Sequence, residues 1–191
     1  IKRAWNRDSL VVHPPVAVDL FKPSPDVTDR YLWVGQMTPY KRADIALEAF
    51  NRLGLPLLMV GEGEMAGDLR RRAKPNVTIV PKLNFDQLRQ AYATCRALVF
   101  TAEEDFGIVP VEAMASGRPV LAYGRGGALD TVARDVSGVF FDRQTVDGLI
   151  EGVERIETWL PHFDPAAAMA HARNFAPERF DDGFRAAVGP L

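Results

Sequence analysis

The sequence has little of what several protein classes require. One cysteine among 191 residues excludes a disulfide framework, and we expect Cys95 to be a small buried residue of a protein from a reducing compartment. No apolar run approaches the roughly 20 residues of a membrane-spanning helix. Basic residues do not outnumber acidic ones, and the formal net charge is −2. A partner nucleic acid is therefore not expected, because phosphate-backbone binding needs a basic face.

Signs of a metal site are also scarce. The chain has no Asp-x-Asp pair, and its three histidines are far apart in sequence. We therefore expect no metal ion and no cofactor. The chain starts without Met on a polar, basic stretch, so we expect it to be a piece of a longer protein.

What the sequence does contain is an alternation of strand and helix patterns. Short apolar runs, typical of buried parallel strands, are separated by segments with helical periodicity. This alternation predicts an α/β fold with a doubly wound, mostly parallel, Rossmann-like sheet and extra C-terminal helices, which pack across the sheet or reach toward a missing neighbour. The expected strands are 31–34, 57–60, 77–80, 97–100, 119–122 and 139–141, and the expected helices are 44–53, 86–95, 109–116, 146–159, 165–174 and 177–188.

A proline-rich stretch near the start of the chain marks an expected domain boundary. Residues 1–28, which include the strand-like run Leu10–Val12, are interpreted as an interdomain linker. Residues 29–191 are then expected to form one domain.

In open α/β sheets, ligands bind at the carboxyl ends of the strands, so the loops after the strands should carry the chemistry. The first such loop begins with Gly35 and Gln36 and places Lys41 and Arg42 where a helix starts. The positive end of a helix disfavours each cation by about 0.3 to 1 kcal/mol, and a bound phosphate would remove this conflict. The alternative is a solvated surface pair, partly offset by Asp44.

Three other loops give weaker signals. Glycines at 61 and 63 let the backbone approach a ligand or simply make a tight turn. The run Pro81-Lys82-Leu83 can offer backbone groups to a nucleobase or form a plain connection. The glycines at 124, 126 and 127 suit a loop that passes close to a ligand, or only a flexible turn.

The most informative loop is acidic. Glu103, Glu104 and Asp105 precede a helix, and a fourth carboxylate, Glu112, follows in its opening turns. Free backbone N–H groups of residues 107–109 at the helix start can hold phosphate or sugar oxygens, while carboxylates accept hydrogen bonds from vicinal hydroxyls. The alternative is that these acids only cap the helix.

The segment from Glu104 to Glu112 matches the E-x7-E motif of family 4 of the retaining glycosyltransferases, and it continues in the family's manner to Val120. The chain resembles the C-terminal, donor-binding domain of this family, which has the two-domain GT-B architecture. The resemblance covers nearly the whole chain, since His13–Phe21, Gly35–Lys41, residues 61–63 and residues 126–127 follow in the family's order. In detail the chain is most similar to bacterial mannosyltransferases that build surface polysaccharides.

The resemblance implies that Lys41 binds the donor phosphates, that Glu104 contacts the transferred sugar and that Glu112 holds the nucleotide ribose. Gln36 stands where the family usually has an arginine, so Lys41 would need help from Arg42, because an amide cannot replace a guanidinium fork. The implied catalytic residues are Glu104 and Lys41, and the implied donor-binding set is Gly35, Gln36, Lys41, Arg42, Gly61, Gly63, Lys82, Leu83, Glu104, Phe106, Gly107, Ile108, Val109 and Glu112.

The implied function is transfer of a sugar from a nucleotide-diphosphate sugar, with GDP-mannose as the expected donor and with retention of configuration. The acceptor would bind an N-terminal domain absent from this chain, so the chain alone should be inactive. We expect a cytoplasmic protein, which could lie at the inner face of the membrane through the absent domain. Two alternatives stay open: a sugar-nucleotide epimerase or hydrolase of similar build, and a non-catalytic flavodoxin-like binding module.

Overall fold

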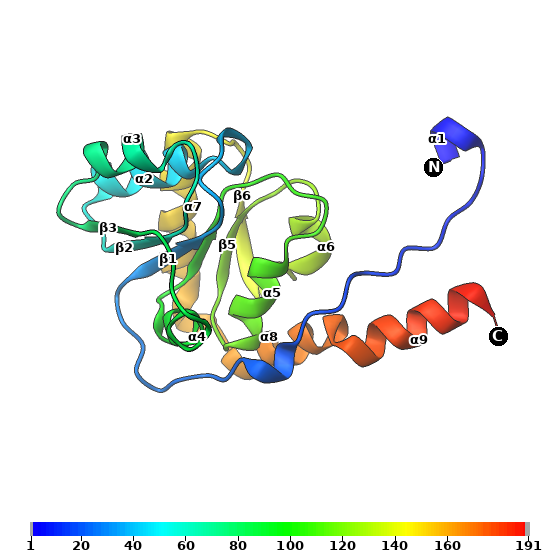
Figure 1. Ribbon diagram of the computed structural model, residues 1–191. Coiled ribbons are helices and arrows are strands. Elements are labelled where there is room, and N and C mark those ends of the chain that lie inside the picture. Colours follow the sequence, from blue (N-terminus) through cyan, green and yellow to red (C-terminus); the bar gives the residue numbers. More distant parts are fainter. Residues whose placement is uncertain (1, 190–191) are drawn as a thin grey trace.

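The computed structural model describes residues 2–189 and contains one six-stranded sheet (Figure 1). All the strands are parallel, in the order β3-β2-β1-β4-β5-β6. This is the predicted doubly wound, Rossmann-like arrangement. The strands are β1 (Tyr31–Val34), β2 (Leu57–Val60), β3 (Val77–Val80), β4 (Leu98–Phe100), β5 (Val120–Tyr123) and β6 (Gly138–Phe141).

Helices follow the strands and then close the chain, as the sequence predicts. The α-helices are α1 (Lys2–Trp5), α2 (Ala43–Leu53), α3 (Ala66–Arg72), α4 (Phe85–Thr94), α5 (Ile108–Ala115), α6 (Ala128–Thr131), α7 (Val146–Trp159), α8 (Pro165–Ala172) and α9 (Pro177–Val188). Short 3-10 turns are η1 (Val18–Leu20), η2 (Pro39–Lys41), η3 (Leu160–His162) and η4 (Arg173–Phe175).

The sheet is buried on both faces, which explains why its strands are apolar throughout. In β1, Tyr31 and Trp33 pack with α2, α3 and α7, while Leu32 faces the opposite layer with α4, α5 and α8. All three side chains are almost fully buried. The strands therefore form a rigid central layer whose loops are held at fixed positions.

The N-terminal segment contributes to the core of this domain. Val16, Val18 and Phe21 are buried, and the amide of Val16 donates a hydrogen bond to the carbonyl of Phe175 (2.8 Å). Upstream, the expected strand at Leu10–Val12 is wrong, because the segment leaves the sheet and has no neighbouring strand with which to pair (Figure 1). The part of this segment from Val16 to Phe21 thus packs against α5 and fixes its position.

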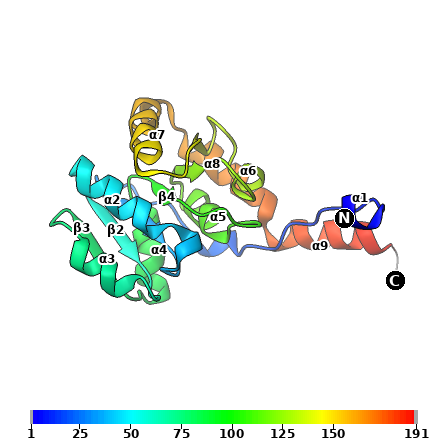
Figure 2. The same ribbon diagram turned by 90° about the horizontal axis from the view of Figure 1, so that it is seen from above.

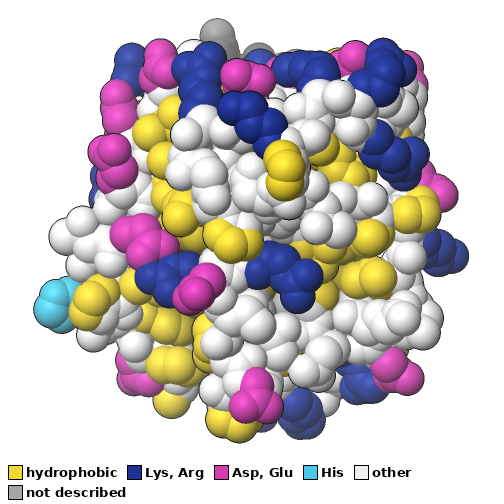
Figure 3. All heavy atoms as spheres, turned by 90° about the vertical axis from the view of Figure 1, so that its left-hand side faces the viewer, with side chains coloured by type: hydrophobic (Ala, Val, Ile, Leu, Met, Phe, Trp, Pro, Cys, Tyr) yellow, Lys and Arg dark blue, Asp and Glu magenta, His cyan; other side chains and the backbone are white. Residues whose placement is uncertain are grey.

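The C-terminal helices differ in how they pack. Helix α7 packs on α2 and on β6, and α8 packs on α5. Helix α9 has no buried residue and projects from the body on the same side as the N-terminal segment (Figures 1 and 2). On the face shown in Figure 3, acidic and basic side chains are interspersed with hydrophobic ones.

Candidate functional site

The strand order reverses between β1 and β4, which lie side by side at the centre of the sheet. The chain leaves β1 toward one edge of the sheet and leaves β4 toward the other, so the two loops diverge above this point. Such a switch point leaves a crevice at the carboxyl ends of the strands, and it is the usual ligand site of doubly wound sheets.

Lys41 from the loop after β1 and Glu104 from the loop after β4 meet at this crevice. The Lys41 ammonium forms an ion pair with the Glu104 carboxylate, and the side chains are only 19% and 18% exposed. They line a hollow of about 540 Å³ together with Pro14, Tyr40, Glu103 and residues 105–109. The structure therefore brings together the two residues expected to be catalytic.

A buried hydrogen-bond chain fixes the backbone of Lys41. The indole N–H of Trp33 donates to the Thr101 hydroxyl (3.0 Å), and this hydroxyl donates to the Lys41 carbonyl (2.7 Å). Gln144 donates to the Thr101 carbonyl (2.9 Å). Because Thr101 is fully buried, β1, β4 and the loop after β6 hold the position of Lys41 together.

Helix α5 begins at the wall of the same hollow. Its first turn has no side-chain cap, so the N–H groups of Ile108 and Val109 remain available. Gly107 precedes them with φ of 87°, a backbone conformation that favours glycine. No neighbouring acid hydrogen-bonds to this helix start, and Glu104 pairs with Lys41 instead.

Two neighbouring segments hold the acidic loop. The amide of Gly127 donates to the Glu104 carbonyl (2.7 Å), and a Cβ at Gly127 would lie 2.3 Å from the Cα of Phe106. On the other side, the ring of Phe106 stacks on His13 (centroids 5.4 Å apart) and meets Phe175 edge-on. The loop conformation thus depends on glycine after β5 and on aromatic contacts from both ends of the chain.

Glu112, on the next turn of α5, lies toward α4. Its Oε2 accepts a hydrogen bond from the Tyr92 hydroxyl (2.7 Å). Burial raises the pKa of Glu112, and the hydrogen bond from Tyr92 opposes this shift. The carboxylate is therefore a partly desolvated acceptor with one oxygen already engaged.

The remaining residues of the loop after β1 have separate roles. Arg42 forms two hydrogen bonds with Asp44 (both 3.1 Å), as the surface-pair alternative expects, and Gln36 is exposed. Gly35, Gly61 and Gly63 allow two loops to touch, because a Cβ at Gly61 would lie 1.8 Å from the Gly35 carbonyl oxygen. These glycines serve close backbone packing beside the hollow.

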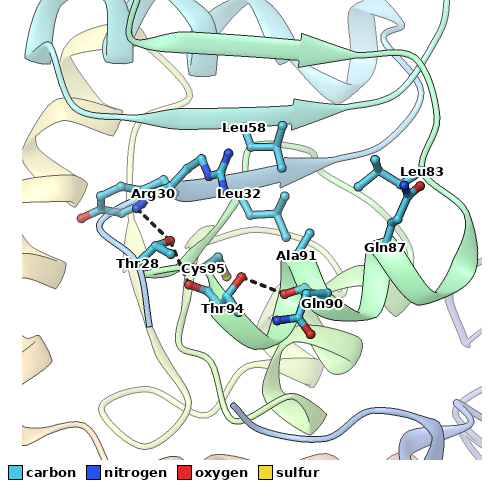
Figure 4. A pocket seen from close by; sticks show the side chains of 11 residues that line it. Thr28, Arg30, Leu32, Leu58, Leu83, Gln87, Gln90, Ala91, Thr94 and Cys95 are labelled. Carbon is cyan, nitrogen blue, oxygen red and sulfur yellow. Dashed lines mark hydrogen bonds between the residues drawn. The ribbon is translucent and has the colours of Figure 1, made fainter. Parts of the chain in front are cut away.

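Lys82 and Leu83 lie apart from the ion pair. Lys82 is exposed, and the side chain of Leu83 lines a different pocket of about 270 Å³ between β1, β2 and α4 (Figure 4). The lining of this pocket is mostly apolar and includes Leu32, Leu58 and Ala91. It shares no lining residue with the hollow at Lys41.

Comparison with known proteins agrees with this geometry. The family model described as "Glycosyl transferases group 1" matches residues 21–159, which include both loops of the ion pair. The chain belongs to the group 1 glycosyl transferases.

Group 1 relatives with assigned activities include a D-inositol 3-phosphate glycosyltransferase of Segniliparus rotundus, which is 32% identical over 92% of this chain and 45% of that protein. The O-antigen chain mannosyltransferase C of Escherichia coli is 29% identical over 66% of this chain and 36% of that protein. The chain thus spans less than half the length of these relatives.

Solved structures share the fold. HepE of Anabaena, in complex with UDP and glucose, superposes with a TM-score of 0.80 at 21% identity, over 95% of this chain and 57% of HepE. Sucrose-phosphate synthase of Thermosynechococcus elongatus gives 0.76 at 23% identity, over 96% and 53% of the two chains. The fold is therefore the Rossmann-like fold of GT-B glycosyltransferases, as predicted.

Two features are absent from residues 2–189 of this group 1 glycosyl transferase. No three His, Cys, Asp or Glu side chains lie together as a metal ion would need. No helix in that range is both long and apolar enough to cross a membrane.

Sequence patterns do not predict the roles of three residues at this site, which are Tyr92, Thr101 and His13. Tyr92 occupies a core position of α4, and a tyrosine hydroxyl buried there needs a hydrogen-bond partner. Thr101, directly after a buried strand, is the kind of polar residue that burial obliges to hydrogen bond.

Proposed function

We propose that this chain is the donor-binding half of a retaining, metal-independent glycosyltransferase that takes a nucleotide-diphosphate sugar. The observation that carries the proposal is the Lys41–Glu104 ion pair beside the uncapped start of α5. Lys41, two free N–H groups and the carboxylate of Glu104 converge on one hollow, which Glu103 and Asp105 also line. This combination suits a sugar attached to a phosphate.

The diphosphate would bind at Lys41 and the start of α5. Backbone N–H groups and the positive end of a helix favour an anion there. Glu104 now serves as the counterion of Lys41, and a diphosphate would take over that role with more charge and more acceptor oxygens.

Glu104, released from Lys41, would accept hydrogen bonds from hydroxyls of the transferred sugar. Glu112 would do the same for the two ribose hydroxyls, since an ionised carboxylate has about four acceptor positions. The buttressed loop between them, from Glu104 to Val109, keeps both carboxylates on one rigid support.

The same residues stabilise the reaction's charge. When the bond between sugar and diphosphate breaks, negative charge grows on the leaving phosphate, and Lys41 with the N-terminus of α5 lies ready to stabilise it. Departure of the diphosphate and arrival of the acceptor hydroxyl on the same face of the sugar would retain the configuration. The departing diphosphate would take the proton of that hydroxyl, so no base on the opposite face is needed.

For the donor we propose GDP-mannose, used in building a surface polysaccharide. One relative bears the name O-antigen chain mannosyltransferase C, and the sequence resembles enzymes of that kind. A thermal-shift panel of GDP-, UDP-, ADP- and dTDP-sugars tests this, because a ligand that binds only the native state raises its stability. GDP-mannose should give the largest shift, and a larger shift with a UDP-sugar would replace it as the donor.

The acceptor half would be an N-terminal domain of the same protein. Helix α9 and the segment before Val16 project together and expose large apolar side chains, a surface that a second domain could cover. The exposed residues are Trp5, Leu10, Val11, Phe184 and Val188. We propose that the protein acts in the cytoplasm, at the inner face of the membrane through the second domain.

Transfer of radiolabelled sugar tests the division of labour. The full-length protein should move label to an acceptor, while residues 1–191 alone should bind nucleotide and transfer nothing. Transfer by these residues alone would contradict the two-domain proposal. Label released or isomerised without an acceptor would instead indicate a hydrolase or an epimerase.

A further inference from the structure

Tyr92 is a buried polar side chain whose role the donor site does not yet explain. It lies on the last turns of α4 with no exposed surface, and its ring meets that of Phe21 edge-on at 5.8 Å. Core packing fixes the ring, so its hydroxyl has little freedom to move. A tyrosine used only for packing could equally be a phenylalanine.

The hydroxyl of Tyr92 donates to Oε2 of Glu112 at 2.7 Å. Among the described residues, Oε1 of Glu112 accepts no hydrogen bond from the protein, so one carboxylate oxygen is engaged and the other is available. A glutamate side chain has three rotatable bonds, and a single hydrogen bond to a rigid phenol removes much of this freedom.

We propose that Tyr92 is a positioning residue for the donor ribose. Its hydroxyl fixes the carboxylate of Glu112 so that Oε1 meets the 2′- and 3′-hydroxyls of the nucleotide in one prepared orientation. This inference rests on the proposed function of Glu112 as the ribose acceptor. In this proposal, residues of both α4 and α5 determine the preference for a ribose diol.

The electrostatics of the pair are consistent with this role. Burial raises the pKa of Glu112, whereas the hydrogen bond from Tyr92 lowers it. Burial and the nearby carboxylate both raise the pKa of Tyr92, which keeps the phenol protonated and able to donate. The hydroxyl thus helps to keep the carboxylate charged in a partly desolvated place.

The chain offers a matched control. Tyr31 is also fully buried, and its hydroxyl donates to the carboxylate of Glu157, which Arg96 also binds. This cluster lies where β1 begins, at the amino ends of the strands, whereas the loops of the donor site follow their carboxyl ends. Tyr31→Phe and Tyr92→Phe therefore remove the same kind of buried hydrogen bond, but only one of them next to Glu112.

The test measures dissociation constants of UDP, GDP and their 2′,3′-dideoxy counterparts by calorimetry on the full-length protein. Tyr92→Phe should weaken the better-bound ribonucleotide about fivefold to tenfold and leave its dideoxy analogue within twofold. Tyr31→Phe should lower the melting temperature but leave both affinities unchanged. Wild-type ribonucleotide affinity in Tyr92→Phe, or an equal loss for both nucleotides, would overturn the role of Tyr92.

The Glu112→Gln background keeps the question answerable if Tyr92→Phe alone folds poorly, because it removes the carboxylate that would be left without its donor. In the Glu112→Gln background, Tyr92→Phe should not change the preference for ribose over dideoxyribose. A full-sized further loss there would overturn the proposal. If the wild-type protein bound none of these nucleotides, the proposed function itself would fail.

Discussion

Lys41 and Glu104 form an ion pair across the point where the strand order of the sheet reverses. Each follows one of the two central strands, so the pair lies in the crevice where we propose that the donor binds. Both side chains lose part of their hydration there, and each neutralises the charge of the other.

Removal of the acid should therefore free the lysine. Glu104→Gln should bind UDP or GDP about twofold to fivefold more tightly, since an ion pair of this kind contributes about 0.2–1 kcal/mol. Sugar transfer by the full-length protein should nevertheless fall, because the contact with the sugar hydroxyls is weakened. Calorimetry and a transfer assay measure the two effects, with Glu48→Gln, which disrupts an exposed ion pair, as the control. Weaker nucleotide binding in Glu104→Gln would contradict the competition between carboxylate and diphosphate.

The raised pKa of Glu112 predicts a pH dependence of ribose recognition. Its uncharged form dominates below the raised pKa, so preference for a ribonucleotide over its dideoxy analogue should be lost as the pH falls through a value above the ordinary 4.5. Tyr92→Phe should move the midpoint of this loss to higher pH, because the hydrogen bond that lowers the pKa of Glu112 is gone. The measurement is the ratio of the dissociation constants of the ribonucleotide and its dideoxy analogue between about pH 4 and pH 7. Titration of the phosphates affects both nucleotides equally and cancels in this ratio. If Glu112→Gln lost the preference for the ribonucleotide at the same pH, another titrating group would be responsible.

The close approach of Gly127 to the acidic loop predicts a sharp effect of one methyl group. In Gly127→Ala the new Cβ would overlap the backbone of Asp105 and Phe106, so the loop must shift. We expect a loss of about 1–3 kcal/mol in the free energy of unfolding, together with weakened nucleotide binding. Urea unfolding and calorimetry check both. Gly67→Ala on α3 is the control, because nothing lies within 4 Å of its added Cβ, and it should not destabilise the fold.

The stacking of His13 on Phe106 links the N-terminal segment to the same loop. His13→Ala should weaken donor binding by about 0.5–1.5 kcal/mol, and His13→Phe should restore most of it, because the ring contact matters rather than the ring nitrogens. Binding curves for both variants decide this, beside His162→Ala at an exposed site. Equal losses in the alanine and phenylalanine variants would indicate a role for the imidazole nitrogens instead.

The sheet could be predicted well because local chemistry determines it. Three expected strands match their observed bounds, and a fourth starts one residue late because Pro119 has no N–H to donate to the sheet. The run Leu10–Val12 has the same apolar character but forms no strand, since a strand needs a neighbour and the sequence does not say where the segment goes.

The candidate site was predictable only in part. Lys41 and Glu104 follow strands whose order places them together, so a sequence pattern can find them. The hydrogen bond from Tyr92 to Glu112 joins residues 20 positions apart on two helices and depends on how α4 lies beside α5. The contact of His13 with Phe106 joins the N-terminal segment to the loop after β4. Neither pair has a periodic or spacing signal, because tertiary packing alone creates it.

The most direct test of the donor site is calorimetric titration of UDP and GDP into the full-length protein and its Lys41→Ala and Glu112→Ala variants. Wild-type protein should bind the diphosphate of its donor, and each variant should bind it at least about tenfold more weakly, a loss of about 1.4 kcal/mol. Unchanged affinity in both variants, with both proteins folded, would contradict the assignment of this hollow as the donor site.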